Sequence, residues 1–152
     1  MKLYRIARRE HIGDLNGEGA RIHGGRWNEK GVPVVYASGS RALAALEYLV
    51  HVPLVLAPHD LALCTLSLPD DASVTRLRRS AIPDGWQTSP PPPDTMRIGT
   101  RWAREAKTLL LAVPSAAIAG ETNYLINPRH REFRKIRKKV EPFAFDPRLR
   151  QA

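Results

Sequence analysis

The apolar residues of this chain come in short runs that are bounded by glycine, proline or charged residues. Even the run at residues 109–114 is far shorter than the roughly 20 residues that a membrane-spanning helix needs. The N-terminal sequence MKLYRIARRE mixes charged with apolar residues, so no signal peptide is predicted there. For 152 residues we therefore expect one compact unit that is soluble, cytoplasmic and free of membrane contacts.

Most of the apolar runs favour strands, so strands should outnumber helices. Strands are predicted at residues 3–6, 32–37, 54–68 with a turn at 57–60, near 74, 109–113 and 143–145. Helices are predicted at residues 41–51 and 94–106, and a short helix is predicted within 129–139. Ser40 is the candidate N-cap of the first helix and Asp94 that of the second. The proline-rich residues 76–94 are interpreted as a linker within the fold.

The predicted helix at residues 41–51 carries a carboxylate on its apolar stripe. Leu43, Leu46 and Val50 define that stripe, and Glu47 falls on it. An unpaired buried carboxylate costs several kcal/mol, so it needs donors, a cation or a water-lined pocket, and a functional role would explain it. The alternatives are a glutamate that reaches solvent at the edge of the stripe, or one paired with His51 one turn later.

The long glycine-rich loop at residues 13–31 is a candidate for ligand contact, with a plain surface loop as the alternative. It contains GGRWN at residues 24–28, where two glycines allow close backbone approach just before Arg26 and Trp27. A guanidinium can bind a phosphate with two parallel hydrogen bonds. The motif therefore suits a phosphate site, although a glycine turn with an exposed arginine fits it equally well.

Four further polar residues lie near predicted strand ends or turns. Tyr36 is by default a core aromatic, Ser115 a cap or turn residue, and Asn123 and Asn127 turn formers. Each is weak evidence for a site when taken alone.

The sequence offers no metal-binding pattern. The five histidines lack the spacing of a zinc site, and the one cysteine, Cys64, lies in an apolar segment and is interpreted as core. The net charge of +9 predicts an anionic partner, which could be nucleic acid, a phosphorylated small molecule or an acidic protein.

Taken together, GGRWN, VVYAS (34–38), ALEYLVH (45–51), VPSA (113–116) and NYLINPRH (123–130) resemble the RES-domain family, named for its Arg, Glu and Ser. The similarity runs from LYRI at residues 3–6 through IPDGW (82–86) and IGTRW (98–102) to FAFDPRL (143–149). The chain departs from the family at Arg131, where many relatives have proline, and in the proline run at residues 90–93.

This resemblance implies a single α+β domain over residues 1–152 that is similar to the ADP-ribosyltransferase fold, with a split, mostly antiparallel β core and flanking helices. It implies NAD as the substrate, cleaved between nicotinamide and ribose, with no metal and no bound cofactor. The absence of a GxGxxG motif agrees with NAD as substrate rather than as redox cofactor.

The resemblance also assigns roles to residues. Arg26 would hold the NAD phosphates, Glu47 would bind the nicotinamide ribose and stabilise its developing positive charge, and Ser115 would orient the nicotinamide or its ribose. Tyr36 would pack against the nicotinamide, with Trp27 and Asn127 as further substrate contacts.

The resemblance leaves the acceptor open, because water, inorganic phosphate and a protein side chain each give a different product. It implies a toxin that depletes NAD, forms a homodimer and pairs with a helix-turn-helix antitoxin, through which it would meet DNA only indirectly. The seven Lys and Arg residues within 129–139 could receive an acidic antitoxin segment or be a solvated face. A nucleic-acid-binding or ribonuclease toxin, and a non-catalytic relative, are the rival hypotheses.

Overall fold

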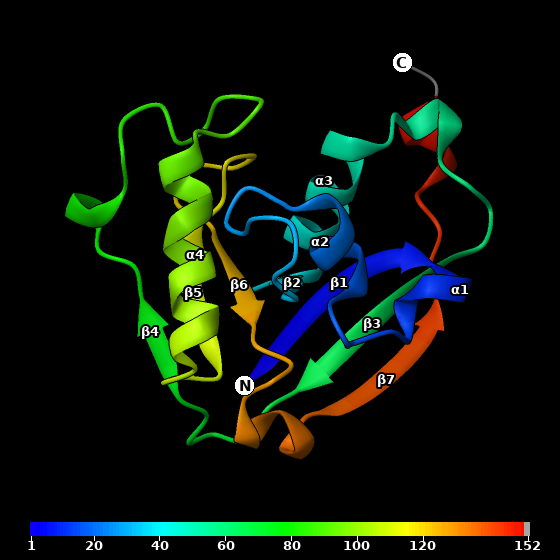
Figure 1. Ribbon diagram of the computed structural model, residues 1–152. Helices are drawn as coiled ribbons and strands as arrows, with labels where there is room; N and C mark the ends of the chain where they lie inside the picture. Colours follow the sequence, from blue (N-terminus) through cyan, green and yellow to red (C-terminus); the bar gives the residue numbers. More distant parts are fainter. Residues whose placement is uncertain (151–152) are drawn as a thin grey trace.

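The computed structural model describes residues 1–150, which form one seven-stranded sheet with helices on it (Figure 1). The strand order is β4-β5-β6-β2-β1-β3-β7, and only the pair β4 and β5 is parallel. The strands are β1 (Lys2–Arg8), β2 (Val35–Ser38), β3 (Leu61–Ser67), β4 (Val74–Arg76), β5 (Leu110–Pro114), β6 (Thr122–Ile126) and β7 (Arg137–Pro142).

The sheet is split between β1 and β2. These strands are paired at one position, Tyr4 with Ser38, whereas β1 and β3 pair along their whole length. The two parts of the sheet, β4-β5-β6-β2 and β1-β3-β7, are therefore joined by this one residue pair and separate away from it. This arrangement confirms the predicted α+β fold with a split, mostly antiparallel core.

Residues 1–150 contain four α-helices: α1 (Arg9–Ile12), α2 (Glu18–His23), α3 (Arg41–His51) and α4 (Pro93–Glu105). The predicted cap of α3 is confirmed, because Ser40 Oγ accepts a hydrogen bond from the Leu43 backbone N–H at 3.1 Å. α3 packs on β1 and β2 and so lies over the split. Asp94 lies in the first turn of α4 rather than at its cap, which is Pro92.

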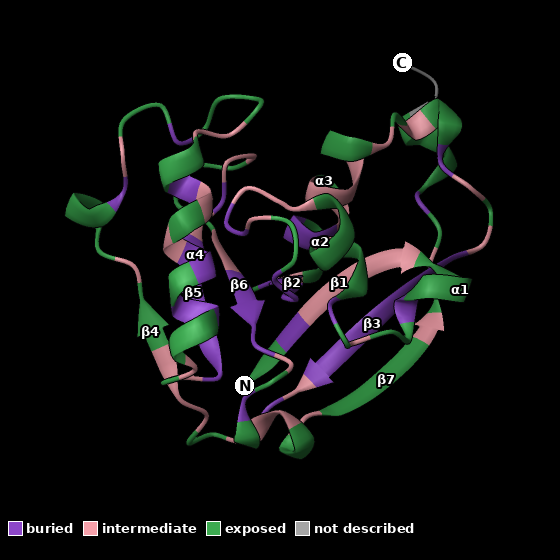
Figure 2. Cartoon of the chain, viewed as in Figure 1, coloured by how far each residue is buried: buried purple, intermediate pink, exposed green. Residues whose placement is uncertain are grey.

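The buried apolar residues of the described chain form two large clusters and a small third one around Ala57, Leu61 and Phe145. Strands β3 and β5 are buried along most of their length (Figure 2). The first contains Leu3, Cys64 and Leu66, which agrees with Cys64 as a core residue. The second contains Trp27, Trp86 and Trp102 and joins α4 to β5 and β6. Within residues 1–150, no helix combines the length and hydropathy needed to cross a membrane.

Several predicted elements differ from the structure. The loop at residues 13–31 contains α2, and the strand expected at 32–37 begins only at Val35, since Pro33 has no N–H for a ladder. Residues 54–56, expected as strand, form a 3-10 helix, and further 3-10 helices occupy Arg79–Ala81, Arg131–Lys135 and Pro147–Arg150.

The strands β6 and β7 were not predicted where they occur. Asn123 and Asn127 were interpreted as turn formers, but Asn123 lies within β6 and Asn127 directly after it, and β6 pairs with both β2 and β5. The last strand was expected at residues 143–145, yet β7 ends at Pro142 and begins with the last three basic residues of the segment, Arg137, Lys138 and Lys139. β7 is an exposed edge strand, and its lysines agree with the usual protection of sheet edges.

Candidate active site

A cleft of about 1010 Å³ opens on the side of the sheet that carries α3. Its walls come from α2 and the GGRWN loop, from α3, from Pro114 at the end of β5 with Ala116 and Ala117 after it, and from Gln87, Ser89 and Pro91. Arg26, Tyr36 and Glu47 line it together. Residues that are far apart in the sequence thus meet in one cavity of the size that small-molecule sites have.

Glu47 is half-buried in the wall of this cleft and accepts two hydrogen bonds on the same oxygen. Ser115 Oγ donates to Glu47 Oε1 at 2.6 Å, and Asn123 Nδ2 donates to the same atom at 2.5 Å. Within residues 1–150, no protein group hydrogen-bonds Oε2. One carboxylate oxygen is therefore fixed by the protein, and the other remains available to a ligand.

The donors to Glu47 are themselves fixed. Ser115 follows β5 directly, and its Oγ accepts hydrogen bonds from the N–H groups of Ala117 and Ile118, both at 3.1 Å. Since a hydroxyl has a single proton, these bonds direct that proton to Glu47. Ser38 Oγ donates to Asn123 Oδ1 at 2.8 Å, which orients the amide so that its NH₂ group faces the carboxylate.

Arg26 enters the cleft from the GGRWN loop. Its Nη1 donates to the backbone oxygens of Trp86 at 2.5 Å and Thr88 at 2.9 Å. The remaining N–H groups of the guanidinium make no hydrogen bond to residues 1–150. Arg26 is therefore positioned by one nitrogen and can offer its other donors to an anion.

Tyr36 supports the loop that carries Arg26. Its hydroxyl accepts from the Trp27 backbone N–H at 3.1 Å and donates to Asn28 Oδ1 at 2.7 Å. Burial raises the pKa of Tyr36 well above its ordinary value, so the hydroxyl keeps the proton that it donates. A Cβ at Gly25 would lie 2.6 Å from this hydroxyl, which explains the glycine at that position.

A smaller cavity of about 260 Å³ lies at the split of the sheet, beside Tyr4, Ala37 and Tyr48. It shares four lining residues with the main cleft: Tyr36, Glu47, His51 and Asn123. Glu47 thus stands where two cavities meet. The larger can take an extended ligand and the smaller one ring or a small nucleophile.

Comparison with known proteins gives the family. The family model of the RES domain matches residues 2–148. This chain belongs to the RES domain family. It is 42% identical over 146 residues to a Sphingobium protein named Prs ADP-ribosylating toxin, covering 94% of this chain and 91% of that protein. It is 39% identical over 153 residues to a Yersinia enterocolitica protein named Toxin Res, covering 99% and 100% of the two chains.

The fold has a counterpart among solved structures. The crystal structure of the Mycobacterium tuberculosis MbcT–MbcA toxin–antitoxin complex contains a chain that matches with a TM-score of 0.67 at 20% identity, covering 99% of this chain and 86% of that one. The family resemblance predicted from the sequence motifs is confirmed, and this match shows that the fold is shared.

The structure of this RES domain brings Arg26, Tyr36 and Glu47 together in the cleft. Ser115 is buried and lines neither cavity, so it contacts Glu47 rather than the space for a ligand, which corrects its expected direct contact with substrate.

Asn127 lies elsewhere. Asn127 is buried and lines neither cavity, because its Nδ2 donates to the Ala103 oxygen at 2.9 Å and its Oδ1 accepts from the Arg129 N–H at 3.0 Å. The expected substrate contact at Asn127 is therefore corrected: Asn127 holds α4 to the end of β6. Asn123, four residues earlier, is the amide in the site.

Two other expectations concern Glu47 and Trp27. Within residues 1–150, no ion pair joins Glu47 to His51, although both line the cleft. Trp27 reaches the cleft but is mostly buried, with its ring centroid 5.6 Å from that of Trp86. It acts mainly as packing beneath the loop.

Asn28 is a supporting residue that sequence reasoning missed. Its Nδ2 donates to the backbone oxygens of Ala20 at 2.9 Å and Val32 at 3.0 Å, and its Oδ1 receives the Tyr36 proton. The signal was present as the last letter of GGRWN, but a fully buried asparagine cannot be told from a turn asparagine in a sequence.

The cleft carries charges of both signs. Arg26 and Lys30 line it together with Glu29 and Glu47, and the histidines His23 and His51 add further polar groups. Within the described part of the chain, no group of three or more His, Cys, Asp or Glu side chains is placed to hold a metal ion. The arrangement suits an organic ligand that combines negative charge with hydroxyl groups.

Proposed function

We propose that this RES domain protein is the toxin of a toxin–antitoxin pair, and that it cleaves the bond between nicotinamide and ribose in NAD. The observation that carries the proposal is the carboxylate of Glu47, fixed through Oε1 by Ser115 and Asn123 and free at Oε2 on the wall of a cleft that also contains Arg26.

The chemistry needs a fixed anion beside the ribose. When the C–N bond breaks, its electron pair leaves with nicotinamide and positive charge develops on the ribosyl ring. A preoriented carboxylate stabilises that charge more strongly in the transition state than in the ground state, and such groups are typically worth about 10²- to 10³-fold in rate. Glu47 would also accept a hydrogen bond from a ribose hydroxyl through Oε2.

Arg26 would hold the diphosphate with the N–H groups that the Trp86 and Thr88 oxygens leave free. Tyr36, which lines both cavities, would pack against nicotinamide and keep the Arg26 loop in place. NAD is the substrate in this proposal, and no metal or separate cofactor takes part.

The acceptor attacks the anomeric carbon and releases its proton. Water would give ADP-ribose, inorganic phosphate would give the 1″-phosphate of ADP-ribose, and a protein side chain would give ADP-ribosylation. A protein acceptor is our second candidate function, because the Sphingobium relative with 42% identity is named an ADP-ribosylating toxin.

We also propose a cytoplasmic antitoxin partner of the helix-turn-helix type and a homodimer. An antitoxin partner is supported by the MbcT–MbcA toxin–antitoxin complex, because one chain of that complex has the same fold as this chain. The nucleic-acid hypothesis has less support, because none of the basic residues of 129–139 lines either cavity. Arg129 lies in the turn after β6, and the others lie on the 3-10 helix Arg131–Lys135 and on β7.

The test is to incubate purified, antitoxin-free protein with NAD, with and without inorganic phosphate, and to separate the products by chromatography. Release of nicotinamide that depends on Glu47 is expected. ADP-ribose, its 1″-phosphate or label on added bacterial protein then names the acceptor. No nicotinamide under any of these conditions would contradict the proposal.

A further inference from the structure

One wall of the cleft has no role in the chemistry above. Residues 86–91, here called the strap, precede α4 and include the first prolines of the run at 90–93. Alternate residues of the strap, Gln87, Ser89 and Pro91, line the cleft. Trp86, at the start of the strap, is buried, and the backbone oxygens of Trp86 and Thr88 accept hydrogen bonds from Arg26.

The strap is held in place before any ligand arrives. The Trp86 side chain is 7% exposed and packs on Trp27 with an interplanar angle of 34°. The Thr88 N–H donates to the Gly85 oxygen at 2.9 Å, and Thr88 Oγ1 donates to the Pro90 oxygen at 3.1 Å. Because the backbone of this wall is already ordered, it loses little conformational entropy when a ligand binds, and less of the binding free energy is offset.

The cleft face of the strap offers unused polar groups beside apolar ones. Within residues 1–150, the side chains of Gln87 and Ser89 make no hydrogen bond, and both are exposed. Pro91 and Met96, which also line the cleft, add apolar surface next to them. A flat heteroaromatic base with a ribose matches this mixture, because its ring needs apolar contact and its edges need donors and acceptors.

The order of groups in a dinucleotide fixes which part meets the strap. Glu47 marks the position of the nicotinamide ribose, and Arg26, which is bonded directly to the strap, marks the diphosphate. The adenosine therefore extends past Arg26. We propose that the strap binds the adenosine half of NAD through Gln87, Ser89 and Pro91, so that the protein selects the dinucleotide over nicotinamide mononucleotide. This inference rests on the proposed function.

The kinetic test compares kcat/KM for NAD with kcat/KM for nicotinamide mononucleotide, which lacks the adenylate. In the double variant Gln87→Ala/Ser89→Ala, the preference for NAD should fall about 10-fold, as expected for two lost hydrogen bonds. The matched control is Ser80→Ala, an exposed serine outside the cleft, which should keep the wild-type preference. An unchanged preference in a double variant that still cleaves NAD would overturn the role of the strap and leave the proposed function intact.

A binding measurement separates the two proposals further. Calorimetric titration of the Glu47→Gln protein with ADP-ribose should show about 10-fold weaker binding when Gln87 and Ser89 are also replaced, and ribose 5-phosphate serves as the ligand without an adenine. If the wild-type protein cleaves neither nucleotide but its ADP-ribose affinity depends on the strap, the NAD-cleaving function is overturned and the adenosine site stands. If ADP-ribose affinity does not depend on the strap, the adenosine site is overturned.

Discussion

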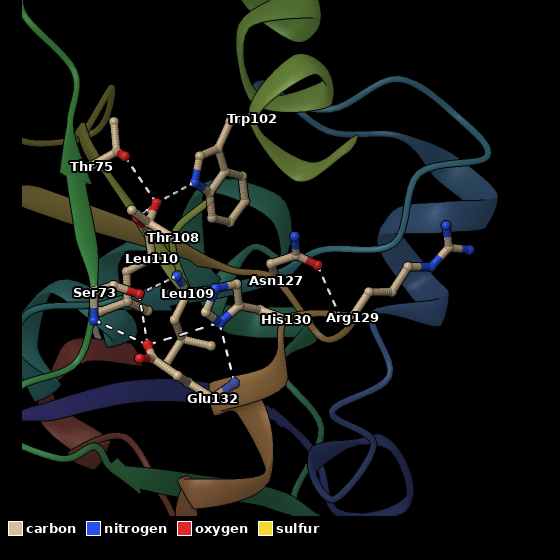
Figure 3. Close-up of polar contacts among 10 residues, drawn as sticks. All are labelled: Ser73, Thr75, Trp102, Thr108, Leu109, Leu110, Asn127, Arg129, His130 and Glu132. Atoms are coloured by element: carbon tan, nitrogen blue, oxygen red, sulfur yellow. Dashed lines mark hydrogen bonds and ion pairs between the residues drawn. The ribbon is translucent and has the colours of Figure 1, made fainter. Parts of the chain in front are cut away.

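Two glutamates of this protein each accept hydrogen bonds from a serine hydroxyl and from a second donor. Glu47 receives Ser115 Oγ at 2.6 Å and the Asn123 amide at 2.5 Å. Glu132 receives Ser73 Oγ at 2.6 Å and the Ser73 backbone N–H at 3.3 Å (Figure 3). At the level of the carboxylate the two arrangements are closely similar.

Their surroundings differ. Ser73 Oγ also accepts from the Leu109 N–H at 2.9 Å, and His130 Nδ1 lies 3.9 Å from Glu132 Oε2, so the group joins the starts of β4 and β5 to the turn before β7 (Figure 3). Glu132 lines neither cavity, whereas Glu47 lines both. Ser73, Leu109 and Glu132 therefore form a structural clamp that holds segments together. The same serine–glutamate pairing becomes a candidate site at Glu47 because that carboxylate lines a cavity.

The largest expected effect is that of Glu47→Gln, which should lower NAD cleavage about 10²- to 10³-fold because the amide cannot stabilise positive charge. The matched change Glu132→Gln should leave the cleavage rate near that of the wild type and lower the melting temperature. Nicotinamide release and thermal unfolding of the two variants measure this. An equal loss of NAD cleavage in Glu47→Gln and Glu132→Gln would contradict the assignment of Glu47 to the site and of Glu132 to the clamp.

The two serines should separate in the same way. Ser115→Ala removes a hydrogen bond to the reacting carboxylate and should lower kcat about 10- to 100-fold. Ser73→Ala should cost about 1–3 kcal/mol of unfolding free energy, since it removes the hydroxyl donor to Glu132 and leaves the Leu109 N–H without its acceptor. Denaturant unfolding and initial rates of both variants check this, and a slow but undestabilised Ser73→Ala protein would contradict it.

Asn123 and Asn127 form a second matched pair. Asn123→Ala should lower kcat about 10-fold with a small effect on stability, because its amide orients Glu47. Asn127→Ala should mainly destabilise the protein, because it leaves the buried Ala103 oxygen unpaired. Rates and melting temperatures reversed between the two would restore Asn127 as a substrate contact.

The clamp around Glu132 should make the free energy of unfolding depend on pH in the acidic range. The hydrogen bonds from Ser73 hold the pKa of Glu132 below its ordinary 4.5, with smaller electrostatic contributions from His130 and Lys135. A carboxyl whose pKa is lower in the folded state stabilises the protein above its unfolded pKa and loses that contribution as the pH falls. The difference in unfolding free energy between wild type and Ser73→Ala should therefore be constant near neutral pH and shrink below about pH 4.5. If this difference in unfolding free energy grew as the pH fell, the pKa of Glu132 would be raised rather than lowered by folding, and the prediction would be contradicted.

The smallest effect is expected on β7. Replacing Lys138 and Lys139 by Gln should change NAD cleavage less than about twofold, because exposed charges far from a site contribute little. Steady-state rates at low salt are the measurement. A large loss would favour the nucleic-acid or anion-steering role of the basic segment.

The sequence predicted those parts of the site that local patterns encode. Glu47 was singled out because it interrupts the predicted stripe of Leu43, Leu46 and Val50. The helix is confirmed, but only Leu43 of that stripe is buried, whereas Leu46 is 43% and Val50 63% exposed, so the buried stripe was wrong although Glu47 does face the cleft. Ser115 was expected near a strand end, and it follows β5 directly. The α+β class and the split of the core followed from the family resemblance, and helix α3 from its cap and stripe.

What the sequence could not predict depends on contacts between distant segments. Asn123 and Asn127 have the same chemistry, and only the pairing of β6 with β2, Val35 opposite Ile126, decides which amide faces the cleft. β7 escaped prediction because an exposed edge strand has no alternation of buried and exposed residues. The clamp of Ser73, Leu109 and Glu132 joins three segments that no local pattern links.

The most direct test of the central claim is a crystal structure of the Glu47→Gln protein with NAD bound. The account predicts a hydroxyl of the nicotinamide ribose within about 3.2 Å of the side chain at position 47, the diphosphate on Arg26 and the adenosine against the strap. A dinucleotide bound in the opposite direction, with adenosine beside position 47, or one bound outside the cleft would contradict it.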